Sequence, residues 1–575
     1  MMSWHTFRAD NPRPWFKVSA WTICLVVALC ELWSGRYYTD PDGISYLDMS
    51  DGVHLLDWHM MINAYWSPLY PFLIGVARWI IRPSAYWELP VVHLLNFVIF
   101  LGTLMSFAFL LTQAVQSQRQ HDRLNVNDAT DPLPELIWTL LGYSLFAWST
   151  FVLINGVRKV NPDLGVAACI YLDAGLLLRL RTRTNKVTTA LLLGLTLGLG
   201  YYVKAVLFPL AFVFMAVAFF VAGGWRRAIV PTLLMLLVFG LIAAPLVIAT
   251  SKSTGHLTFG DSGSNNYARN VDGEKTLPFY SSSPPKYLIH PLTLAHYAPD
   301  VYEFGQPFKA TYPLWYDVSY WDAGFKSGIH LKAQLLVLVQ SAKEIFITLI
   351  LPVFGAIVAY FVLLLRGQTL AGSLRNVLKS WPLILPGVAG LGLYSLVAVE
   401  PRYVAAFLVL IWIGLFSGIR LRGTNQAIKP AAITALIFAG WLMAIVAGFA
   451  AYHLVRPLQI LRGQGGTYYR VAEALNAEGL EPGQAVGILG SGWDGMMWAR
   501  AARLRIVAQI IPENADDFWQ MQNSQKEDEV YEAFAKTGAK AVVTEETPPP
   551  GELANWQRVG GTKYYVHFLV APTGR

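Results

Sequence analysis

Four carboxylate side chains lie close together just after the first long apolar run of the sequence. The segment reads DPDGISYLDMSDG and contains Asp40, Asp42, Asp48 and Asp51. A carboxylate can accept the proton of a reacting hydroxyl group, and several carboxylates together can bind a hard divalent cation. Acidic loops also occur without any chemistry, because Asp favours turns and the first positions of helices. This segment alone leaves both interpretations open.

Further charged residues lie where later apolar runs begin or end. Asp163 begins one run, Lys204 lies near the end of another, and Glu400 and Arg402 lie between two more. A charge at membrane depth is costly unless it is paired or hydrated, so such residues commonly belong to functional sites. The two cations could instead extend to the membrane surface without a function. Together with the acidic segment, these residues predict an outward-facing pocket with carboxylates opposite cations.

The composition indicates which elements must hold these residues. The chain of 575 residues is 54% hydrophobic and only 14% charged, whereas soluble proteins are about 25% charged. Apolar runs of about 20 residues, long enough to cross a membrane, recur along the chain. They predict a mainly α membrane protein with about eleven transmembrane helices. The predicted spans are 15–33, 90–112, 134–154, 163–178, 187–206, 207–223, 228–249, 344–365, 381–398, 403–419 and 430–452.

Basic residues between the runs predict the orientation of the chain. The first run follows Arg8, Arg13 and Lys17 and ends without a small-residue cleavage site, so we expect a retained anchor and not a signal peptide. The positive-inside rule then places three long segments outside the cytoplasm, namely 34–89, 250–343 and the tail after 452. The remaining inner clusters are Arg179, Arg181, Arg183 and Lys186; Arg226 and Arg227; Arg366, Arg375 and Lys379; and Arg420, Arg422 and Lys429.

The three outer segments differ in character. In the first, the stretches 44–58 and 69–81 are amphipathic and rich in aromatic residues, which predicts helices lying on the membrane surface. The second, 250–343, contains Gly260-Asp261-Ser262-Gly263 and a run of aromatic residues from Tyr312 to Trp321. It is expected either to cover the site, since aromatic faces stack on sugars, or to pack as a loop domain on the membrane surface, and we assign it no catalytic role. The tail is charged and alternates strand-like with helix-like stretches, which predicts a small α/β domain over 453–575.

Several other kinds of site are not supported. The three cysteines, Cys24, Cys30 and Cys169, lie in apolar runs, so neither a disulfide framework nor a thiolate metal site is expected. The outer histidines show no zinc-binding spacing. The net charge of +7 comes from clusters that flank the apolar runs, so no nucleic-acid partner is expected.

One glycine-rich pattern is similar to a dinucleotide-binding loop. The sequence GSGWDG at 490–495 lies between a predicted strand and a predicted helix. The acidic residue that such sites place about 20 residues later is missing, and Gln509 stands at the end of the next strand. The tail is also predicted to lie outside, where soluble nicotinamide cofactors are scarce. We interpret the pattern as a structural turn and expect no NAD.

The charged motifs, taken in order, resemble the GT-C fold of the polyprenyl-phosphate-sugar glycosyltransferases. The nearest groups are the lipid A aminoarabinose transferases and the protein O-mannosyltransferases. Two departures leave the acceptor and any metal open: Asp42-Gly43 replaces the usual Asp-Glu, and Trp66-Ser67-Pro68 replaces the Lys-Pro-Pro of the lipid A group. The resemblance covers residues 1–452 and is carried by Asp42 and Tyr46, Ser67-Pro68-Leu69-Tyr70-Pro71, Pro162-Asp163, Glu400 and Arg402-Tyr403.

The resemblance implies a role for individual residues. Asp42 would take the proton of the acceptor hydroxyl as it attacks the anomeric carbon. Arg402 and Lys204 would stabilise the charge that develops on the leaving lipid phosphate. One carboxylate without a second, nucleophilic carboxylate is what an inverting reaction needs. The residues expected to complete the substrate site are Tyr46, Glu400 and Tyr403.

The sequence points to no cofactor apart from one candidate, a divalent cation held by Asp40, Asp42 and Asp163. Their spacing is not that of an established metal motif.

The predicted protein is therefore an inverting glycosyltransferase of the bacterial plasma membrane, with its site and its C-terminal domain on the periplasmic side. Its partners would be a polyprenyl-phosphate sugar, membrane lipid, and an extracytoplasmic acceptor that is a lipid, a glycan or a protein. The main alternative is a transporter or flippase for a lipid-linked glycan, in which the same charges line a pathway. Transporters usually have two related halves, and the sequence contains no such repeat. A third reading, a scaffold whose tail binds a partner, leaves the charged residues unexplained.

Overall fold

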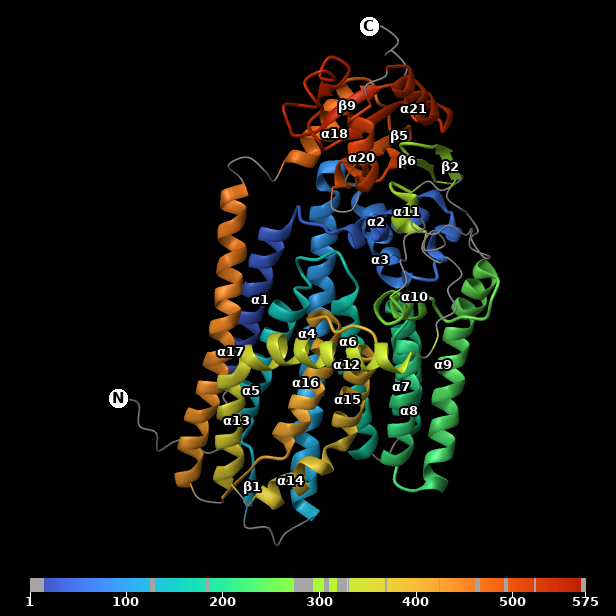
Figure 1. Cartoon of the computed structure of the whole chain (residues 1–575). Helices are drawn as coiled ribbons and strands as arrows, with labels where there is room; N and C mark the ends of the chain where they lie inside the picture. The colour runs from blue at the N-terminus through green and yellow to red at the C-terminus, as the bar shows by residue number, and fades with distance from the viewer. Residues whose placement is uncertain are drawn as a thin grey trace.

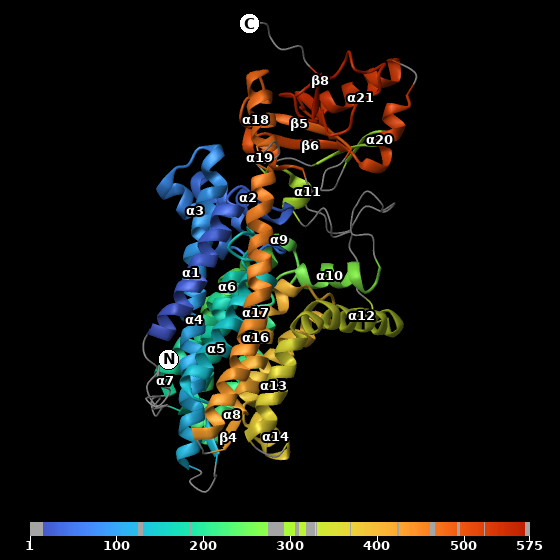
Figure 2. The ribbon, with the colours of Figure 1, turned by 90° about the vertical axis from the view of Figure 1, so that its left-hand side faces the viewer.

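The chain forms a bundle of long helices with an α/β layer at one end (Figure 1). The computed structural model describes residues 15–124, 130–182, 186–273, 293–304, 310–317, 328, 330–367, 370–422, 425–460, 466–490, 495–521 and 524–569. Arg8, Arg13, Arg183 and residues 491–494 of the glycine-rich pattern lie outside these ranges. Seen from two sides, the α/β layer lies beyond the ends of the helices and not beside them (Figures 1 and 2).

Seven of the described helical segments are long and apolar enough to cross a membrane, and one bent pair would make an eighth. The bent pair is α14 (Leu370–Lys379) with α15 (Trp381–Ser395). The seven contain α1 (Trp15–Gly35), α4 (Glu88–Leu124), α5 (Glu135–Ala147) with η4 (Trp148–Ile154), α7 (Lys186–Val203), α9 (Trp225–Thr254), α12 (Leu331–Glu344) with η7 (Ile345–Ile350), η8 (Leu351–Val353) and α13 (Phe354–Gly367), and α17 (Asn425–Ile460).

The predicted runs coincide with helices, but the count of eleven spans is not confirmed. Three of them form α6 (Asp163–Thr182), α8 (Leu207–Val221) and α16 (Pro401–Ser417), which do not have the length and composition of a full span. The helices α8 and α16 are shorter than 18 residues. Four charged residues lie in α6, namely Asp163, Asp173, Arg179 and Arg181.

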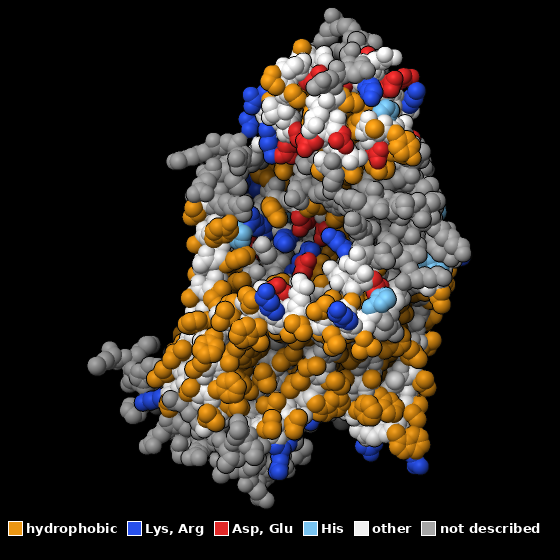
Figure 3. All heavy atoms as spheres, viewed as in Figure 1, with side chains coloured by type: hydrophobic (Ala, Val, Ile, Leu, Met, Phe, Trp, Pro, Cys, Tyr) orange, Lys and Arg blue, Asp and Glu red, His pale blue; other side chains and the backbone are white. Residues whose placement is uncertain are grey.

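Apolar side chains cover the outside of the bundle in a band below the α/β layer (Figure 3). On α9, for example, Leu233, Leu237 and Leu241 are more than half exposed. A helix that is apolar on its outer as well as its inner face is expected where lipid surrounds the protein. The band therefore marks the part of the bundle suited to the hydrocarbon layer.

Residues from three of the predicted inner clusters meet at the end of the bundle away from the α/β layer. Arg181 donates a hydrogen bond to the carbonyl oxygen of Lys379 over 3.0 Å, and both residues line a small cavity with Arg420. At this end β1 (Thr130–Pro132) pairs antiparallel with β4 (Arg420–Arg422) (Figure 1). These clusters lie on one side of the bundle, as the sequence predicts.

Short helices lie between the bundle and the α/β layer (Figures 1 and 2). The two stretches predicted as surface helices in the first outer segment are helical, but the first is not amphipathic, because residues 43–50 are all buried and so do not lie on a membrane surface. That segment forms α2 (Pro41–Leu55), η2 (Trp58–Met61), α3 (Leu69–Ile81) and η3 (Ala85–Trp87), and the second outer segment contributes α10 (Ser262–Asn270) and α11 (Pro313–Tyr316). In contrast to the long helices, α12 runs across the bundle in both views.

The α/β layer is built on a seven-stranded sheet with the order β2-β3-β6-β5-β7-β9-β8. The three central strands are parallel and their outer neighbours are antiparallel. The strands are β2 (Thr293–His296), β3 (Val301–Glu303), β5 (Ala485–Leu489), β6 (Arg505–Ile510), β7 (Ala541–Thr544), β8 (Gln557–Arg558) and β9 (Tyr565–Phe568). The helices of this layer are α18 (Thr467–Ala477), α19 (Met497–Ala502), α20 (Pro512–Trp519) and α21 (Ser524–Lys536).

Two strands of this sheet come from the second outer segment and not from the tail. β3 pairs with β6, placing Val301 opposite Ile510 and Glu303 opposite Ala508. This pairing satisfies backbone groups that an open edge of β6 would leave unpaired. The sheet is therefore shared between 250–343 and the predicted tail domain, 453–575, and it fastens the outer segment to the tail.

Candidate active site

The amino-terminal ends of four helices meet around one cavity. The side chain of Asp40 caps α2 by accepting a hydrogen bond from the Gly43 backbone N–H over 3.1 Å, and Pro41 occupies the first helical position. Helix starts carry a partial positive charge, so four of them together favour an anion. The residues that α2, α6, α8 and α16 place in the cavity at these ends are Asp42, Asp163, Val206 and Arg402.

The cavity has a volume of about 510 Å3, which is in the range of small-molecule sites. Figure 3 shows acidic and basic side chains gathered in a hollow between the apolar band and the α/β layer. All the residues predicted for the substrate site line this cavity: Asp42, Tyr46, Lys204, Glu400, Arg402 and Tyr403. The structure therefore brings together residues from α2, from the turn between α7 and α8, and from α16.

Arg402 connects the carboxylates of this cavity. Its Nη2 donates to Asp42 Oδ2 over 3.3 Å, and its Nε donates to Glu400 Oε2 over 2.8 Å. Its Nε also lies 3.9 Å from Asp163 Oδ2. The side chain of Arg402 is only 14% exposed. A guanidinium held in this way presents its charge in a fixed position.

Lys204 provides a second cation beside the first. Its Nζ lies 2.7 Å from Asp163 Oδ1 and 3.8 Å from the centre of the Tyr403 ring. Asp163 is almost fully buried, whereas Lys204 keeps part of its surface open. The hydroxyl of Tyr403 in turn accepts a hydrogen bond from Arg402 over 2.9 Å. Lys204, Arg402 and Tyr403 thus form one connected group.

Aromatic rings shape the wall next to Asp42. The ring of Tyr46 lies one turn further along α2 and packs edge-on against Trp66 and Tyr70, with centroids 5.3 Å apart in each case. Tyr70 belongs to the Ser67–Pro71 motif that carried the family resemblance, and Trp66 directly precedes that motif, at the position where this sequence departs from the lipid A group. This motif therefore acts here by packing α2 and α3 together around the cavity.

The carboxyl group of Asp42 is suited to proton transfer. It is 24% exposed, so it can reach a molecule in the cavity. Burial raises the pKa of Asp42 above its usual 3.8, while Arg402 and Lys204 oppose this effect. A carboxylate whose pKa is raised is a better proton acceptor than an ordinary one.

The carboxylates predicted as cation ligands do not form a ligand set. Asp163 is bound to Lys204, Asp42 is bound to Arg402, and Asp40 is occupied as the helix cap of α2. Burial, and then the charge of Asp42, raise the pKa of Asp40 to about 6. Within the described ranges, no group of three His, Cys, Asp or Glu residues is arranged to hold a metal ion. The local geometry thus favours protein cations, and not a metal, as partners of these acids.

The structure adds a cation that the sequence did not reveal. Arg269 on α10 lines the cavity with Asn266 and Asn270, and its side chain is exposed. Among the described residues it forms no ion pair, so its charge is open to a ligand. Trp315 on α11 also lines the cavity. Both residues belong to the second outer segment; the aromatic run from Tyr312 to Trp321 was the sequence signal for Trp315, whereas nothing in the sequence marks Arg269.

Comparisons with known proteins identify the fold but no close relative. No family model matches the sequence, and no curated protein matches it. The structure of ArnT from Cupriavidus metallidurans bound to undecaprenyl phosphate is similar, with a TM-score of 0.52, 11% identity, and coverage of 96% of this chain and 98% of that one. The apo structure of the same protein has a TM-score of 0.49 and 12% identity at the same coverage. The Archaeoglobus fulgidus oligosaccharyltransferase in its apo form has a TM-score of 0.47 and 13% identity, covering 94% of this chain and 70% of that one.

At 11% identity, the similarity to ArnT is one of fold, and it extends over almost the whole of both chains. It includes the α/β layer as well as the helical bundle. The resemblance predicted from the sequence is confirmed at this level: the chain has the GT-C fold.

Proposed function

We propose that this protein is an inverting glycosyltransferase that moves a sugar from a polyprenyl-phosphate carrier to an acceptor outside the cytoplasm. The observation that carries the proposal is the pairing of Asp42 with Arg402 inside a cavity next to the apolar band. This cavity contains both a proton acceptor, Asp42, and cations that can stabilise a leaving phosphate. Its position lets a lipid-linked donor keep its chain in the membrane while the sugar enters the cavity.

The reaction follows from the positions of these groups. The acceptor hydroxyl attacks the anomeric carbon and gives its proton to the Asp42 carboxylate. The bond between the sugar and the phosphate oxygen breaks, and its electron pair stays on the phosphate. Arg402, Lys204 and Arg269 then stabilise the added negative charge. The sugar carbon inverts because attack and departure occur on opposite faces.

The other acids are poorly placed to act as a second nucleophile. Asp163 is 3% exposed and bound to Lys204, and Glu400 is held by Arg402. A retaining mechanism would need such a carboxylate next to the sugar carbon. The arrangement supports direct displacement by the acceptor.

The identity of the donor lipid rests on chemistry and on one comparison. The ArnT structure with a TM-score of 0.52 contains undecaprenyl phosphate, and we propose a polyprenyl phosphate for this chain as well. The basic clusters at the opposite end of the bundle support a cavity that faces away from the cytoplasm. We accordingly propose that it opens to the periplasmic side of a bacterial inner membrane.

The test is the release of free lipid phosphate from a set of polyprenyl-phosphate hexoses and pentoses by the purified full-length protein. We expect release by the unchanged protein and a loss of at least about 100-fold in Asp42→Asn, because the general base is removed. Asp517→Asn is the matched control, since Asp517 is an exposed acid on α20. Equal rates in Asp42→Asn and the control would remove Asp42 from the mechanism.

The same assay separates the enzyme from the transporter alternative. A transporter or flippase moves the lipid-linked sugar without breaking the bond to phosphate. Movement of intact donor across vesicles, with no free lipid phosphate from any donor and acceptor tested, would favour the transporter.

A further inference from the structure

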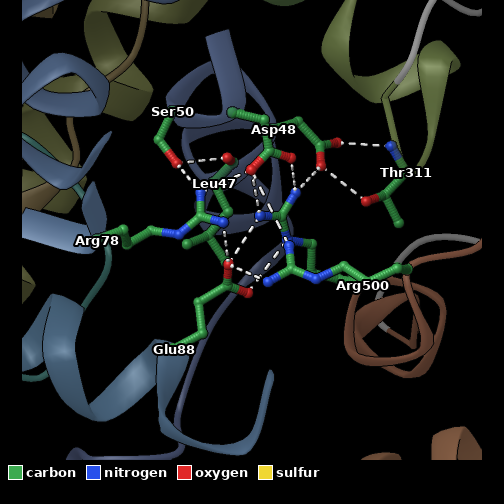
Figure 4. Close-up of polar contacts among 9 residues, drawn as sticks. Leu47, Asp48, Ser50, Arg78, Glu88, Thr311 and Arg500 are labelled. Atoms are coloured by element: carbon green, nitrogen blue, oxygen red, sulfur yellow. Dashed lines mark hydrogen bonds and ion pairs between the residues drawn. The ribbon is translucent and has the colours of Figure 1, made fainter. Parts of the chain in front are cut away.

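One buried arginine from the α/β layer reaches into the layer of short helices beneath it. Arg500, on α19, is 2% exposed, and all three of its guanidinium nitrogens are bonded to carboxylates (Figure 4). Its Nη1 donates to Asp48 Oδ1 over 2.8 Å and to Asp51 Oδ2 over 2.5 Å. Its Nη2 donates to Glu88 Oε1 over 2.8 Å.

Two further arginines complete this network. Arg78 on α3 donates to Asp51 and to Ser50 over 2.7 and 2.6 Å and lies 2.9 Å from Glu88. Arg503, at the end of α19, donates to Glu88 over 3.0 Å. Three cations thus face three acids, and the buried charges balance. Removing one member would leave an uncompensated charge, which is strongly unfavourable in a buried place.

The network also holds the second outer segment. The carboxylate of Asp48 accepts hydrogen bonds from the backbone N–H and from the hydroxyl of Thr311, over 2.9 and 2.7 Å (Figure 4). The carbonyl oxygen of Thr311 accepts from the backbone N–H of Ile506 in β6. The Asp48 carboxylate on α2 is therefore held both by Arg500 and by Thr311, which is itself bonded to β6.

The helix in question is α2, which carries Asp42 in its first turn. Asp51 lies nine residues after Asp42, or about 14 Å along a helix with a rise of 1.5 Å per residue. The helix is closely packed at both ends. A Cβ atom at Gly43 would lie 2.2 Å from Thr39 Oγ1, and one at Gly52 would lie 2.7 Å from the Asp57 carbonyl oxygen. Because α2 is one continuous helix from Pro41 to Leu55, we expect a rotation or shift at Asp51 to reach Asp42.

We propose that Arg500 is a positioning residue, which holds α2 through Asp48 and Asp51 in the rotation that keeps the Asp42 carboxylate against Arg402. The inference deepens the proposed function and rests on it for its catalytic consequence. It gives the C-terminal layer a role in the reaction at a cavity that Arg500 does not line. A displacement of about 1 Å at a reacting group can lower a rate by about 100-fold, so a small rotation is sufficient.

The first test measures donor turnover by full-length Arg500→Met and Arg500→Lys. We expect kcat to fall at least about tenfold in both variants, while KM for the donor changes less than about twofold, because the phosphate cations lie on other elements. Arg505→Met is the matched control, since the Nε of Arg505 bonds to the Gly483 carbonyl oxygen within the same layer. Asp48→Asn is a milder variant that leaves Arg500 paired with Asp51 and Glu88.

A second measurement separates positioning from a loss of folded protein. If Arg500 acts through Asp42, its substitution in an Asp42→Glu background costs little further activity. A purely structural role instead lowers the amount of active protein in both backgrounds by the same factor. The proposal would be overturned if Arg500→Met and Asp48→Asn each lowered activity by the same factor in the Asp42→Glu background as in the unchanged background. It would also be overturned if kcat were unchanged in Asp48→Asn and Arg500→Lys.

A readout without turnover distinguishes this inference from the proposed function. In an Asp42→Cys protein, the rate at which a charged, membrane-impermeant thiol reagent labels the new cysteine reports on the accessibility of position 42. Labelling of the protein without the Asp42→Cys change gives the background from its own cysteines. We expect Arg500→Met and Asp48→Asn to change the labelling rate at least about threefold, and Arg505→Met to leave it unchanged. Changed labelling without any donor turnover in the unchanged protein would refute the glycosyltransferase but not the coupling, whereas unchanged labelling would refute the coupling.

Discussion

Arg402, at the start of α16, donates a hydrogen bond to Asp42, at the start of α2, over 3.3 Å, although 360 residues separate them in the sequence. The contact joins the proposed proton acceptor directly to a cation for the leaving phosphate. Both helices end at the cavity with their positive ends, so the charges are presented by rigid elements.

Arg402→Lys should lower donor turnover by about 100-fold, because a compact ammonium does not span Asp42, Glu400 and a phosphate as the planar guanidinium with its five donors does. Arg402→Met should be at least as damaging. The measurement is lipid-phosphate release at saturating donor. Arg420→Lys, at the opposite end of the bundle, is the control, and a rate for Arg402→Lys equal to that control would contradict the assignment.

Lys204→Met should lower both turnover and stability, because Asp163 would remain as a buried charge without its closest partner. The expected loss of stability is about 3 kcal/mol. The double variant Lys204→Met with Asp163→Asn should recover most of the melting temperature in detergent but not the activity. Recovery of both would show that Lys204 serves only to neutralise Asp163.

Arg269→Met should weaken donor binding with little effect on folding, because Arg269 is exposed and makes no ion pair within the described part of the chain. Loss of one charge-assisted contact corresponds to about 2 kcal/mol, or about 30-fold in affinity. Binding of the polyprenyl phosphate itself is the measurement. Arg226→Met, at the inner end of α9 and away from the cavity, should leave that affinity unchanged, and equal affinities in both variants would exclude Arg269 from the phosphate site.

Glu88→Gln should destabilise the protein in a manner that depends on pH. Arg500, Arg78 and Arg503 all bond the Glu88 carboxylate, whose side chain is 1% exposed, so folding favours its ionised form. A carboxyl with a lowered folded pKa stabilises the protein above its unfolded pKa, and this stabilisation disappears as the pH falls through the folded pKa. The difference in melting temperature between wild type and Glu88→Gln should therefore be constant above about pH 4.5 and shrink at lower pH.

Burial raises the pKa of Asp48, in the same network, to about 6 despite the nearby Arg500. Its protonation between about pH 6 and pH 4 favours the folded state, opposite in sign to the effect of Glu88. Comparing Glu88→Gln with wild type at each pH largely removes this contribution. A difference that grows as the pH falls below 4.5 would contradict the ion pairs of Glu88.

The transferred sugar should show the anomeric configuration opposite to that of the donor, because Asp163 and Glu400 are held by cations and do not form a covalent intermediate. Nuclear magnetic resonance of the first product formed gives the configuration directly. Retention would indicate a nucleophilic carboxylate, and Glu400, which is half exposed, would be the first to substitute.

Much of the cavity could be predicted from the sequence for a simple reason. Apolar runs and basic clusters determine which end of each helix lies at which membrane face. Asp42, Lys204 and Arg402 each stand at such an end, and all three ends fall on the same face. The number of spans was less predictable, because α8 and α16 are too short, and α6 too charged, to resemble ordinary membrane helices.

Contacts between the outer segments left no comparable pattern. Arg500 stands in a short helix of the tail, and only the docking of α19 onto α2 and α3 places it among three acids. Arg269 reaches the cavity because α10 is held against the first outer segment, where the Asp261 backbone N–H donates to the Ala64 carbonyl oxygen and Asn266 donates to the Tyr65 hydroxyl.

Hydrophobicity and charge along the chain predict the order and orientation of the helices and the charges at their outer ends. This is possible because the membrane acts on each segment separately. Which arginine meets which carboxylate across hundreds of residues depended on the packing of whole layers. That packing exists only in the folded chain, because a buried ion pair is stable only when the residues around it are also in place.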